Sequence, residues 1–200
     1  LLQLRELFLF RQMLVRQKHG FQVRRGEKNL TMEKSSTKTT ISQIGRHMVN
    51  ECNKQIEKVE KKIKDIIDAD EELKRTYELI TTIPGIGTQN AVCLLTFTNN
   101  FTRFGYNARK IACYYGIAPF GRDSGTSVHS DPHVHYMANR MLKAMLTQAA
   151  LASIRCCAPI SHYYHRLLSL GKKKQVALNN VKNKLIHIIT AMARNNQPFD

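Results

Sequence analysis

Acidic side chains are scarce in the second part of this sequence of 200 residues. Residues 79–200 hold fourteen Lys and Arg but only three carboxylates, namely Asp123, Asp131 and Asp200. The formal charge of the whole chain is +16. Because Lys and Arg that contact phosphates release counterions, this composition favours a polyanionic partner, above all nucleic acid. The alternative is a basic surface that has no specific partner.

Long apolar runs, paired cysteines and an initiating methionine are also absent. No stretch of about eighteen apolar residues occurs, so we expect no membrane span and no membrane partner. Residues 1–21 carry charges throughout, unlike the apolar core of a signal peptide. The five cysteines form no Cys-x-x-Cys pair, which is typical of reduced thiols in a cytoplasmic protein. Since the first residue is Leu1, we also expect the protein to extend beyond this sequence.

The first 78 residues have the apolar spacing of a helical arm. Six positions in residues 1–21 alternate at intervals of three and four, and they are Leu4, Leu7, Arg11, Leu14, Lys18 and Phe21. A polar linker is expected near residues 26–40. A second helix is expected from about Ser42, with Thr39 or Thr40 as its cap, and some forty residues would make it roughly 60 Å long.

The apolar residues of this long helix follow a heptad pattern. They are Ile56, Val59, Ile63, Ile66, Leu73, Tyr77 and Ile80 with Asp70 as a polar break, continued upstream by Ile41, Ile44, Met48 and Cys52. This spacing is typical of a coiled coil. Charges over residues 41–78 nearly cancel, which favours an architectural role over nucleic-acid binding. We favour homodimerisation, or a higher homo-oligomer, through this helix; the alternative is a hairpin with residues 1–21.

Residues 79–200 are expected to form a compact, mostly α-helical domain. Helices are predicted over 71–82, 88–96, 107–115, 137–157 and 160–170, and from the Lys172–Lys174 turn to about residue 194. Asn107 is the expected cap of the third helix, and Gly171 follows the end of the fifth. The last helix would bury Val176, Val181, Leu185, Ile188, Ile189 and Met192. Residues 116–132 predict loops with at most a short hairpin. The fold class is therefore mostly α, with a coiled-coil arm over 1–78 and a compact domain over 79–200.

A glycine-rich turn, Ile83-Pro84-Gly85-Ile86-Gly87, separates two of these predicted helices. The pattern is typical of a helix–hairpin–helix element, in which glycine permits positive φ and close backbone approach. The free N–H groups of Gly85 and Gly87 at the next helix would then suit a phosphate oxygen and position a duplex without reading bases. An ordinary tight turn between helices is the alternative.

The basic residues that we expect to bind DNA come from several parts of this domain. They are Arg109, Arg122, Arg140, Lys143, Lys172, Lys173 and Lys174. Guanidinium groups near a phosphodiester would stabilise the charge that develops during attack on phosphorus.

The loop Gly121-Arg122-Asp123-Ser124-Gly125-Thr126-Ser127 offers hydroxyl groups beside glycine. Taken alone, this loop is more typical of a structural turn. In a basic domain, however, a serine activated by its surroundings could act as a nucleophile on a phosphodiester. Ser124 is the first candidate and Ser127 the second.

Two other groups of side chains offer alternative chemistry. The histidines and acid of the following segment, His129, Asp131, His133 and His135, lack a standard zinc spacing, so we expect no metal site. One of these histidines could instead carry a proton for a nearby serine. The alternative nucleophiles Tyr114, Tyr115, Tyr136, Tyr163 and Tyr164 are, in helices, better explained by packing.

The ordered motifs resemble those of a known family. Ile83–Gly87, Phe104 with Ala108-Arg109, Gly116-Ile117-Ala118-Pro119, Ser124-Gly125, and Ala138-Asn139-Arg140 with Leu142-Lys143 occur in the same order. Together they resemble the C-terminal transposase domain of the insertion sequence one-ten family, the Piv/MooV-type DNA recombinases. The upstream arm is similar to the segment that joins the family's two domains, so the resemblance covers nearly the whole chain.

The resemblance implies a function larger than this chain. Family members carry an N-terminal RuvC-like domain with four carboxylates that bind a divalent metal, expected to be Mg²⁺, and this domain is missing from the sequence. They recombine DNA with that site and a serine, which corresponds to Ser124 here, and well-studied members are guided by a non-coding RNA. The family's frequent Gly-Asn is Ala138-Asn139 in this chain, a small departure. The resemblance also implies a bacterial, nucleoid-associated protein.

Two function classes therefore stay open. In the first, the chain is part of a transposase whose Ser124 is chemically active in the whole enzyme, and this fragment binds nucleic acid without recombining it. In the second, the chain is a non-catalytic nucleic-acid-binding and dimerisation module with a structural Ser-Gly loop. An RNA- or ribosome-associated basic protein fits the charge but not the order of the motifs.

Overall fold

The chain folds into two compact units, Leu1–Asp70 and Glu71–Asp200. A computed structural model describes residues 1–26, 36–118, 120–124, 128–133 and 139–199, and in the two strands of the second unit it describes the backbone alone. The boundary leaves residues 71–78 in the second unit, whereas the sequence analysis placed them in the arm.

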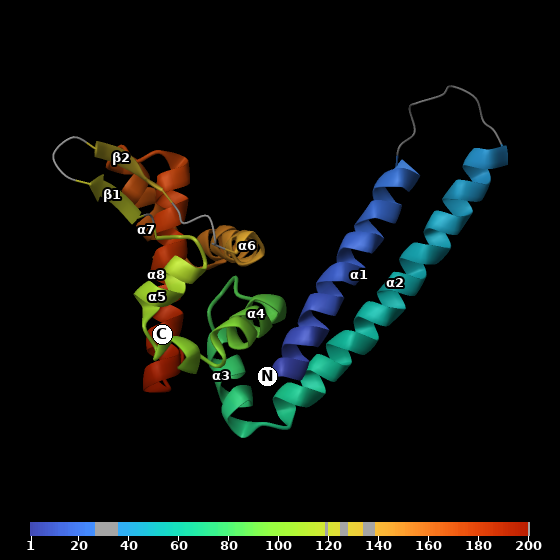
Figure 1. The fold of residues 1–200 in the computed structure, drawn as a ribbon, viewed down its shortest axis with the longest axis horizontal. Coiled ribbons are helices and arrows are strands. Elements are labelled where there is room, and N and C mark those ends of the chain that lie inside the picture. Colours follow the sequence, from blue (N-terminus) through green and yellow to red (C-terminus); the bar gives the residue numbers. More distant parts are fainter. Residues whose placement is uncertain (27–35, 119, 125–127, 134–138, 200) are drawn as a thin grey trace. The chain divides into compact units, whose positions relative to one another are not determined.

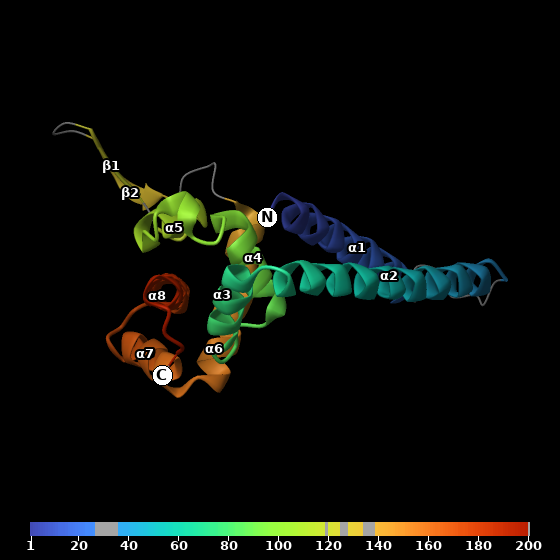
Figure 2. The same cartoon turned by 90° about the horizontal axis from the view of Figure 1, so that it is seen from below.

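The first unit is a pair of antiparallel helices. Helix α1 (Leu2–Gly26) and helix α2 (Ser36–Asp68) lie side by side along their lengths (Figures 1 and 2). Their buried side chains are Leu4, Phe8 and Leu14 from α1 and Val49, Cys52, Ile56, Val59, Ile63 and Ile67 from α2. The Nε of Arg11 donates a hydrogen bond to Oε1 of Glu60 at 2.8 Å. Helix α2 is thus paired within the chain; association with a second copy stays a prediction.

The predicted limits and upstream face of the long helix were wrong. Helix α2 begins at Ser36 rather than near Ser42, because no Gly or Pro between residues 36 and 44 stops the helix. Ile41 and Ile44 are exposed rather than part of the seam. Counting along the antiparallel pair from Arg11 and Glu60, the end of α1 at Gly26 lies opposite about residue 45, so α1 does not reach these two isoleucines.

The long helix also breaks where the heptad spacing predicted continuity. Helix α2 ends at Asp68, and helix α3 (Glu71–Thr81) begins three residues later. Asp70 precedes a first turn that contains Glu71 and Glu72, and acidic residues favour a helix N-terminus because of the helix dipole. The apolar spacing continues across the break through Leu73 and Ile80, but it serves a different core.

The second unit is built around helix α8 (Lys174–Asn195). This helix contacts α3, α5 (Ala108–Tyr114), α6 (Arg140–Cys156) and α7 (Ala158–Ser169), and Figure 2 looks nearly along its axis. Its buried apolar residues are Ala177, Val181, Leu185, Ile186, Ile189 and Met192. The expected burial of Val176 was wrong, since this residue lies in the exposed first turn.

Helix α4 (Thr88–Thr98) is buried on all sides. It contacts α3 and α6, and every residue from Ala91 to Thr98 is buried. It ends at Asn99, whose left-handed conformation lets its N–H bond to the carbonyl of Leu95. The short 3-10 helix η1 (Thr102–Phe104) then leads into α5.

The segment between α5 and α6 contains the strands of this unit. Strands β1 (Phe120–Ser124) and β2 (Val128–His133) pair as an antiparallel hairpin, with an irregularity between Phe120 and Arg122. The prediction of a mostly α fold is confirmed, and the short hairpin lies within the segment predicted as loops. Of the helices that the structure describes, none combines the length and apolar character needed to cross a membrane.

Two isoleucines of α2 test the packing of the first unit. Ile63 is 2% exposed and Ile44 is 57% exposed. We expect Ile63→Ala to lower the free energy of unfolding by about 2–4 kcal/mol because it leaves a cavity between α1 and α2. The matched change Ile44→Ala should alter it by less than about 0.5 kcal/mol. Urea unfolding followed by circular dichroism measures both, and equal losses would contradict the pairing of α1 with α2.

Candidate nucleic-acid interface

The glycines of the predicted phosphate-binding turn have different environments. Gly85 has φ of +95°, and a Cβ there would lie 2.7 Å from both Cα and Oγ of Ser153 and against its backbone N. Ser153 is a buried residue of α6, so the absence of a side chain at Gly85 lets the turn dock on that helix. Gly87 precedes α4, is exposed, and has no atom within 4 Å of such a Cβ. Gly87 therefore has the open position that phosphate binding would need, whereas Gly85 has a packing role.

The candidate nucleophile Ser124 is the last residue of β1. The register pairs Ser124 with Val128 and Asp123 with His129, so the backbone does not set His129 opposite Ser124. Arg122 pairs with Ser130 in the same hairpin. The side chains of Arg122, Ser124, His129, Asp131 and His133 lie outside the described part of the structure. The alternatives Ser127, His135 and Tyr136 lie wholly outside the described residues.

Asn139 positions the basic start of α6. Its side-chain oxygen accepts hydrogen bonds from the backbone N–H of Met141 at 3.0 Å and Leu142 at 3.3 Å. A cap of this type fixes the first helical turn, from which Arg140 is exposed and Lys143 is half-buried. The presence of Asn139 in the Ala138-Asn139 pair is thus explained by this cap. Residue 138 lies outside the described residues.

Lys182 is a buried cation that the sequence analysis missed. It is 6% exposed on α8, and its Nζ lies 3.5 Å from Oγ1 of Thr147 on α6. Thr147 in turn donates to the carbonyl oxygen of Lys143, one turn earlier. Burial lowers the pKa of Lys182, and the Lys143 ammonium group lowers it further. The sequence signal that could have revealed this burial is the position of Lys182 on α8, beside the apolar residues Val181 and Leu185.

The remaining predicted cations are exposed on separate elements. Arg109 lies in the first turn of α5, Lys172 and Lys173 lie in the turn before α8, and Lys174 begins that helix. Gly171, with φ of +78°, makes the preceding helix end, and the N–H of Lys172 bonds to the carbonyl of Leu167 at 3.2 Å. The structure therefore distributes the predicted basic residues over several surfaces rather than gathering them into one pocket.

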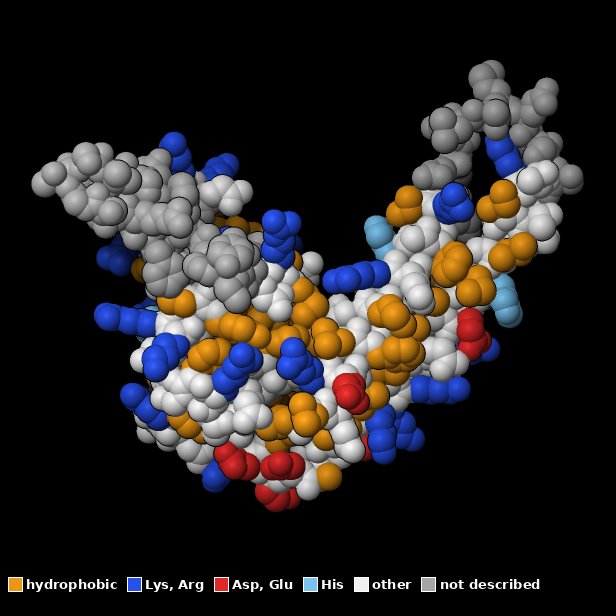
Figure 3. Space-filling view, viewed as in Figure 1, with side chains coloured by type: hydrophobic (Ala, Val, Ile, Leu, Met, Phe, Trp, Pro, Cys, Tyr) orange, Lys and Arg blue, Asp and Glu red, His pale blue; other side chains and the backbone are white. Residues whose placement is uncertain are grey.

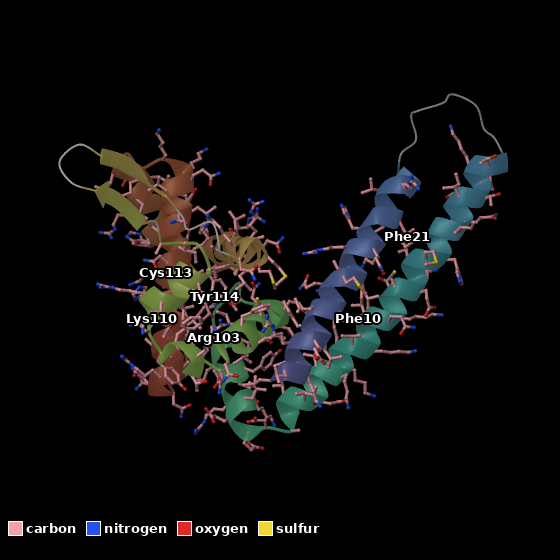
Figure 4. The ribbon with its side chains drawn as sticks, viewed as in Figure 1. Phe10, Phe21, Arg103, Lys110, Cys113 and Tyr114 are labelled. Atoms are coloured by element: carbon pink, nitrogen blue, oxygen red, sulfur yellow. The ribbon has the colours of Figure 1, made fainter. Side chains whose placement is uncertain are left out.

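An aromatic cluster supports a further arginine. The guanidinium carbon of Arg103 lies 4.8 Å from the ring centroid of Tyr114 and 5.4 Å from that of Phe104. Arg103 also donates from Nη1 to the Tyr114 hydroxyl at 3.4 Å and to the carbonyl of Phe97 at 3.5 Å. Figure 4 labels Arg103 and Tyr114 together with Lys110 and Cys113 of α5. These contacts give Tyr114 a packing role and fix Arg103 at the surface.

Tyr115 is poorly suited to nucleophilic attack. It is fully buried next to Cys93, and burial together with Cys93 raises the pKa of Tyr115 well above its ordinary value. Burial also raises the pKa of the Cys93 thiol to about 12. Tyr163 and Tyr164 lie half-buried in α7, where the guanidinium of Arg166 lies over the Tyr163 ring.

Acidic and basic side chains are segregated in this unit. Among its described side chains, the only carboxylates are Glu71, Glu72 and Glu78, and all three lie on α3. In the face that Figure 3 presents, red side chains gather at one edge of this unit, and separate blue side chains are scattered over the rest among hydrophobic and other residues. A surface with one sign of charge concentrates phosphate groups near it.

One segment of this unit is similar to a known protein family. Residues 77–165 match the family model described as Transposase IS116/IS110/IS902 family. This segment is therefore similar to the transposase domain of that family.

Curated proteins are also similar to this chain. The chain is 29% identical to the pilin gene-inverting proteins of Moraxella bovis and Moraxella lacunata over 146 residues, 72% of this chain and 45% of each relative. It is 33% identical to the insertion element IS110 uncharacterized 43.6 kDa protein of Streptomyces coelicolor over 116 residues, 58% of this chain and 28% of the relative. The chain thus spans less than half the length of these curated relatives.

The matched segment runs from Tyr77 in α3 to His165 in α7. It includes the glycine turn, the β1–β2 hairpin with Ser124, and the start of α6. It leaves out Lys172–Lys174 and the whole of α8. The matched segment therefore contains the predicted nucleophile Ser124, while the central packing helix α8 lies beyond it.

The two glycines of the turn provide a matched pair of variants. Gly85→Ala should lower the free energy of unfolding by about 2–4 kcal/mol, because it adds a clash with Ser153 to the cost of positive φ. Gly87→Ala, in open space with a negative φ, should change it by less than about 1 kcal/mol. Thermal and urea unfolding would measure both. A Gly85→Ala protein as stable as the parent would refute the close approach to α6.

The burial of Lys182 predicts an unusual pH dependence of the free energy of unfolding. The pKa of Lys182 is lowered in the folded chain, so in the window just below its ordinary value of 10.5 the unfolded chain binds an extra proton and stability rises with pH. Below that window, Lys182 is charged in both the folded and the unfolded chain, and burying the charged ammonium group costs free energy. Lys182→Met should therefore leave stability unchanged or raise it by about 1 kcal/mol at neutral pH.

The difference between this variant and the parent protein should shrink as the pH rises through the lowered pKa of Lys182. Urea unfolding of both proteins from pH 7 to alkaline pH measures it. Lys184→Met, at an exposed position of the same helix, is the control and should show no such trend. A large loss of stability in Lys182→Met at neutral pH would instead indicate that the ammonium group is stabilised by a carboxylate.

Proposed function

We propose that this chain is the nucleic-acid-binding and serine-bearing part of a DNA transposase that moves an insertion sequence. The observation that carries the proposal is the family match over residues 77–165, which contains both the β1–β2 hairpin with Ser124 and the basic start of α6. The names of the relatives, which refer to gene inversion and to an insertion element, also describe rearranged DNA.

The proposed chemistry is an exchange of phosphodiester bonds. The Oγ of Ser124 would bond to phosphorus while the bond from phosphorus to one bridging oxygen breaks. The serine proton passes to a base, and the departing oxygen takes up a proton and leaves as a sugar hydroxyl. The product is a phosphoserine–DNA ester. Attack on this ester by the hydroxyl of a new strand end reverses the exchange and completes strand transfer.

Basic side chains in β1 and in the first turn of α6 would support this exchange. Arg122 lies in β1, and Arg140 and Lys143 lie in the first turn of α6, which Asn139 fixes. Positive charge held near phosphorus stabilises the transition state more than the ground state. In the proposed function these residues, with Gly87, Arg109 and Lys172–Lys174, hold the DNA backbone.

Other parts of the proposed enzyme lie outside this chain. Among the described residues, no three His, Cys, Asp or Glu gather as a metal site would require. The divalent metal ion expected for the family would thus need carboxylates from a RuvC-like domain beyond these residues, and we assign no step to it. A structured guide RNA and a homodimer, or a higher homo-oligomer, remain part of the proposal.

A covalent adduct tests the proposed serine chemistry. The full-length protein with its guide RNA would be incubated with a nicked DNA substrate that traps the cleaved intermediate. We expect an adduct that survives denaturation and that mass spectrometry maps to Ser124. Ser124→Ala should abolish the adduct and lower recombination by at least about 100-fold, with DNA affinity nearly unchanged.

Ser127→Ala is the matched control, and it should leave both the adduct and recombination in place. An adduct at Ser127 or at a tyrosine would keep the reaction class but move the nucleophile. Recombination that persists in Ser124→Ala would sink the serine mechanism and favour the non-catalytic binding module.

A further inference from the structure

The end of α8 and the start of α5 enclose a groove that none of the preceding chemistry uses. Its volume is about 430 Å³, and its polar lining comes from Tyr106, Asn107, Arg109, His187, Thr190 and Arg194. Three of these residues precede or begin α5, and three lie along the last two turns of α8. Both elements belong to the second unit and contact each other directly.

The groove is lined by cations without a balancing carboxylate. Its lining includes two arginines and a histidine and no Asp or Glu. Arg109 and Arg194 are both exposed, and neither forms an ion pair within the described ranges of the chain. Arg194 donates a hydrogen bond to its neighbour Asn195, from Nε at 3.3 Å. The guanidinium groups are therefore available to an anionic ligand.

One wall of the groove is held in a strained conformation. Tyr106 has φ of +54°, in the left-handed region that a bulky side chain rarely adopts. Its ring stacks on Phe101 with centroids 6.1 Å apart, and its N–H donates to the Phe101 carbonyl at 3.2 Å. Such a conformation is unfavourable for a tyrosine, and conformations of this kind are concentrated at binding sites.

The turn that holds Tyr106 also sets Arg109. The side chain of Asn107 accepts a hydrogen bond from the Lys110 N–H at 3.1 Å and so caps α5. On the other side, Asn179 of α8 donates from Nδ2 to the Ile117 carbonyl at 2.8 Å, which ties the segment after α5 to α8. The backbones that carry Arg109 and Arg194 are therefore held by both packing and hydrogen bonds.

We propose that this groove between α5 and α8 binds the sugar-phosphate backbone of a nucleic-acid strand, with Arg109 and Arg194 contacting phosphates. Guanidinium groups match phosphate oxygens in bidentate geometry, and an open groove accepts a chain that passes through it. The inference rests on the proposed function and gives its nucleic-acid partner a specific place. It adds Tyr106, His187 and Arg194, which had no assigned role, and Arg194 lies outside the matched transposase segment.

The salt dependence of binding tests this site. Fluorescence anisotropy of the whole 200-residue chain would follow labelled single-stranded DNA, duplex DNA and single-stranded RNA of one sequence, at salt concentrations from 50 to 300 mM, roughly the range in which phosphate contacts dominate. In Arg109→Gln/Arg194→Gln, two phosphate contacts are lost. The slope of log K against log salt should then become shallower by about 1.4 for single strands or about 1.8 for a duplex.

A matched double variant controls for the loss of two charges. Arg155 and Arg166 are exposed on α6 and α7 and do not line the groove. Arg155→Gln/Arg166→Gln should keep a slope within about 0.5 of the parent, because it removes no phosphate contact. Arg109→Lys/Arg194→Lys, which keeps the charge but not the bidentate fork, should bind between the parent and the glutamine variant. Circular dichroism checks that each variant is folded.

The outcomes separate the groove from the proposed function. A shallower slope in Arg109→Gln/Arg194→Gln, but not in Arg155→Gln/Arg166→Gln, supports the groove. The probe that shows this difference identifies single-stranded DNA, duplex DNA or RNA as the ligand. Equal slopes in the parent and the glutamine variant overturn the groove while leaving the Ser124 adduct untouched. Failure of the parent to bind all three probes overturns both the groove and nucleic-acid binding by this chain.

Discussion

The packing of α8 is the constraint on which the rest of the second unit depends. Val181, Leu185 and Ile189 of this helix are fully buried, and the helix contacts α3, α5, α6 and α7. Each buried side chain of this size contributes about 1.5–3 kcal/mol. Helix α8, which follows both α5 and α6 in the chain, therefore fixes the positions of Arg109 on α5 and Arg140 on α6. The glycine turn enters the same assembly through the contact of Gly85 with Ser153.

Repulsion among the cations of this unit opposes its folding, and this repulsion favours a polyanionic partner. Lys182 lies within the core, where the Lys143 ammonium group lowers its pKa, and its Nζ lies near Oγ1 of Thr147 rather than near a carboxylate among the described residues. The described acids of this unit lie on α3. Repulsion among the remaining cations raises the free energy of the folded state, and a bound polyanion lowers it. A bound nucleic acid, the partner that we propose, would therefore stabilise the folded domain.

The sequence predicted periodic features well and non-local ones poorly. Asn107 as a cap, Gly171 after α7 and the α1 seam through Leu4 and Leu14 are local signals, and the structure has them. The break at Asp70 was missed because the 3-4 spacing continues through Leu73, although the core changes. The role of Gly85 could not be inferred, since Ser153 lies 68 residues away along the chain. The groove could not be inferred from the sequence either, because Arg109 and Arg194 line the same groove only once α8 packs on α5.

The same dependence limits what the matched segment can do alone. Residues 77–165 end inside α7 and exclude every residue of α8. Without α8, helices α5 and α6 would lose the contacts that they make with it, and Lys143 would lose its neighbour Lys182. The groove would also keep Arg109 and lose Arg194. The folded functional unit therefore extends through α8, and the family match identifies the segment that carries the predicted chemistry rather than the whole domain that holds it in place.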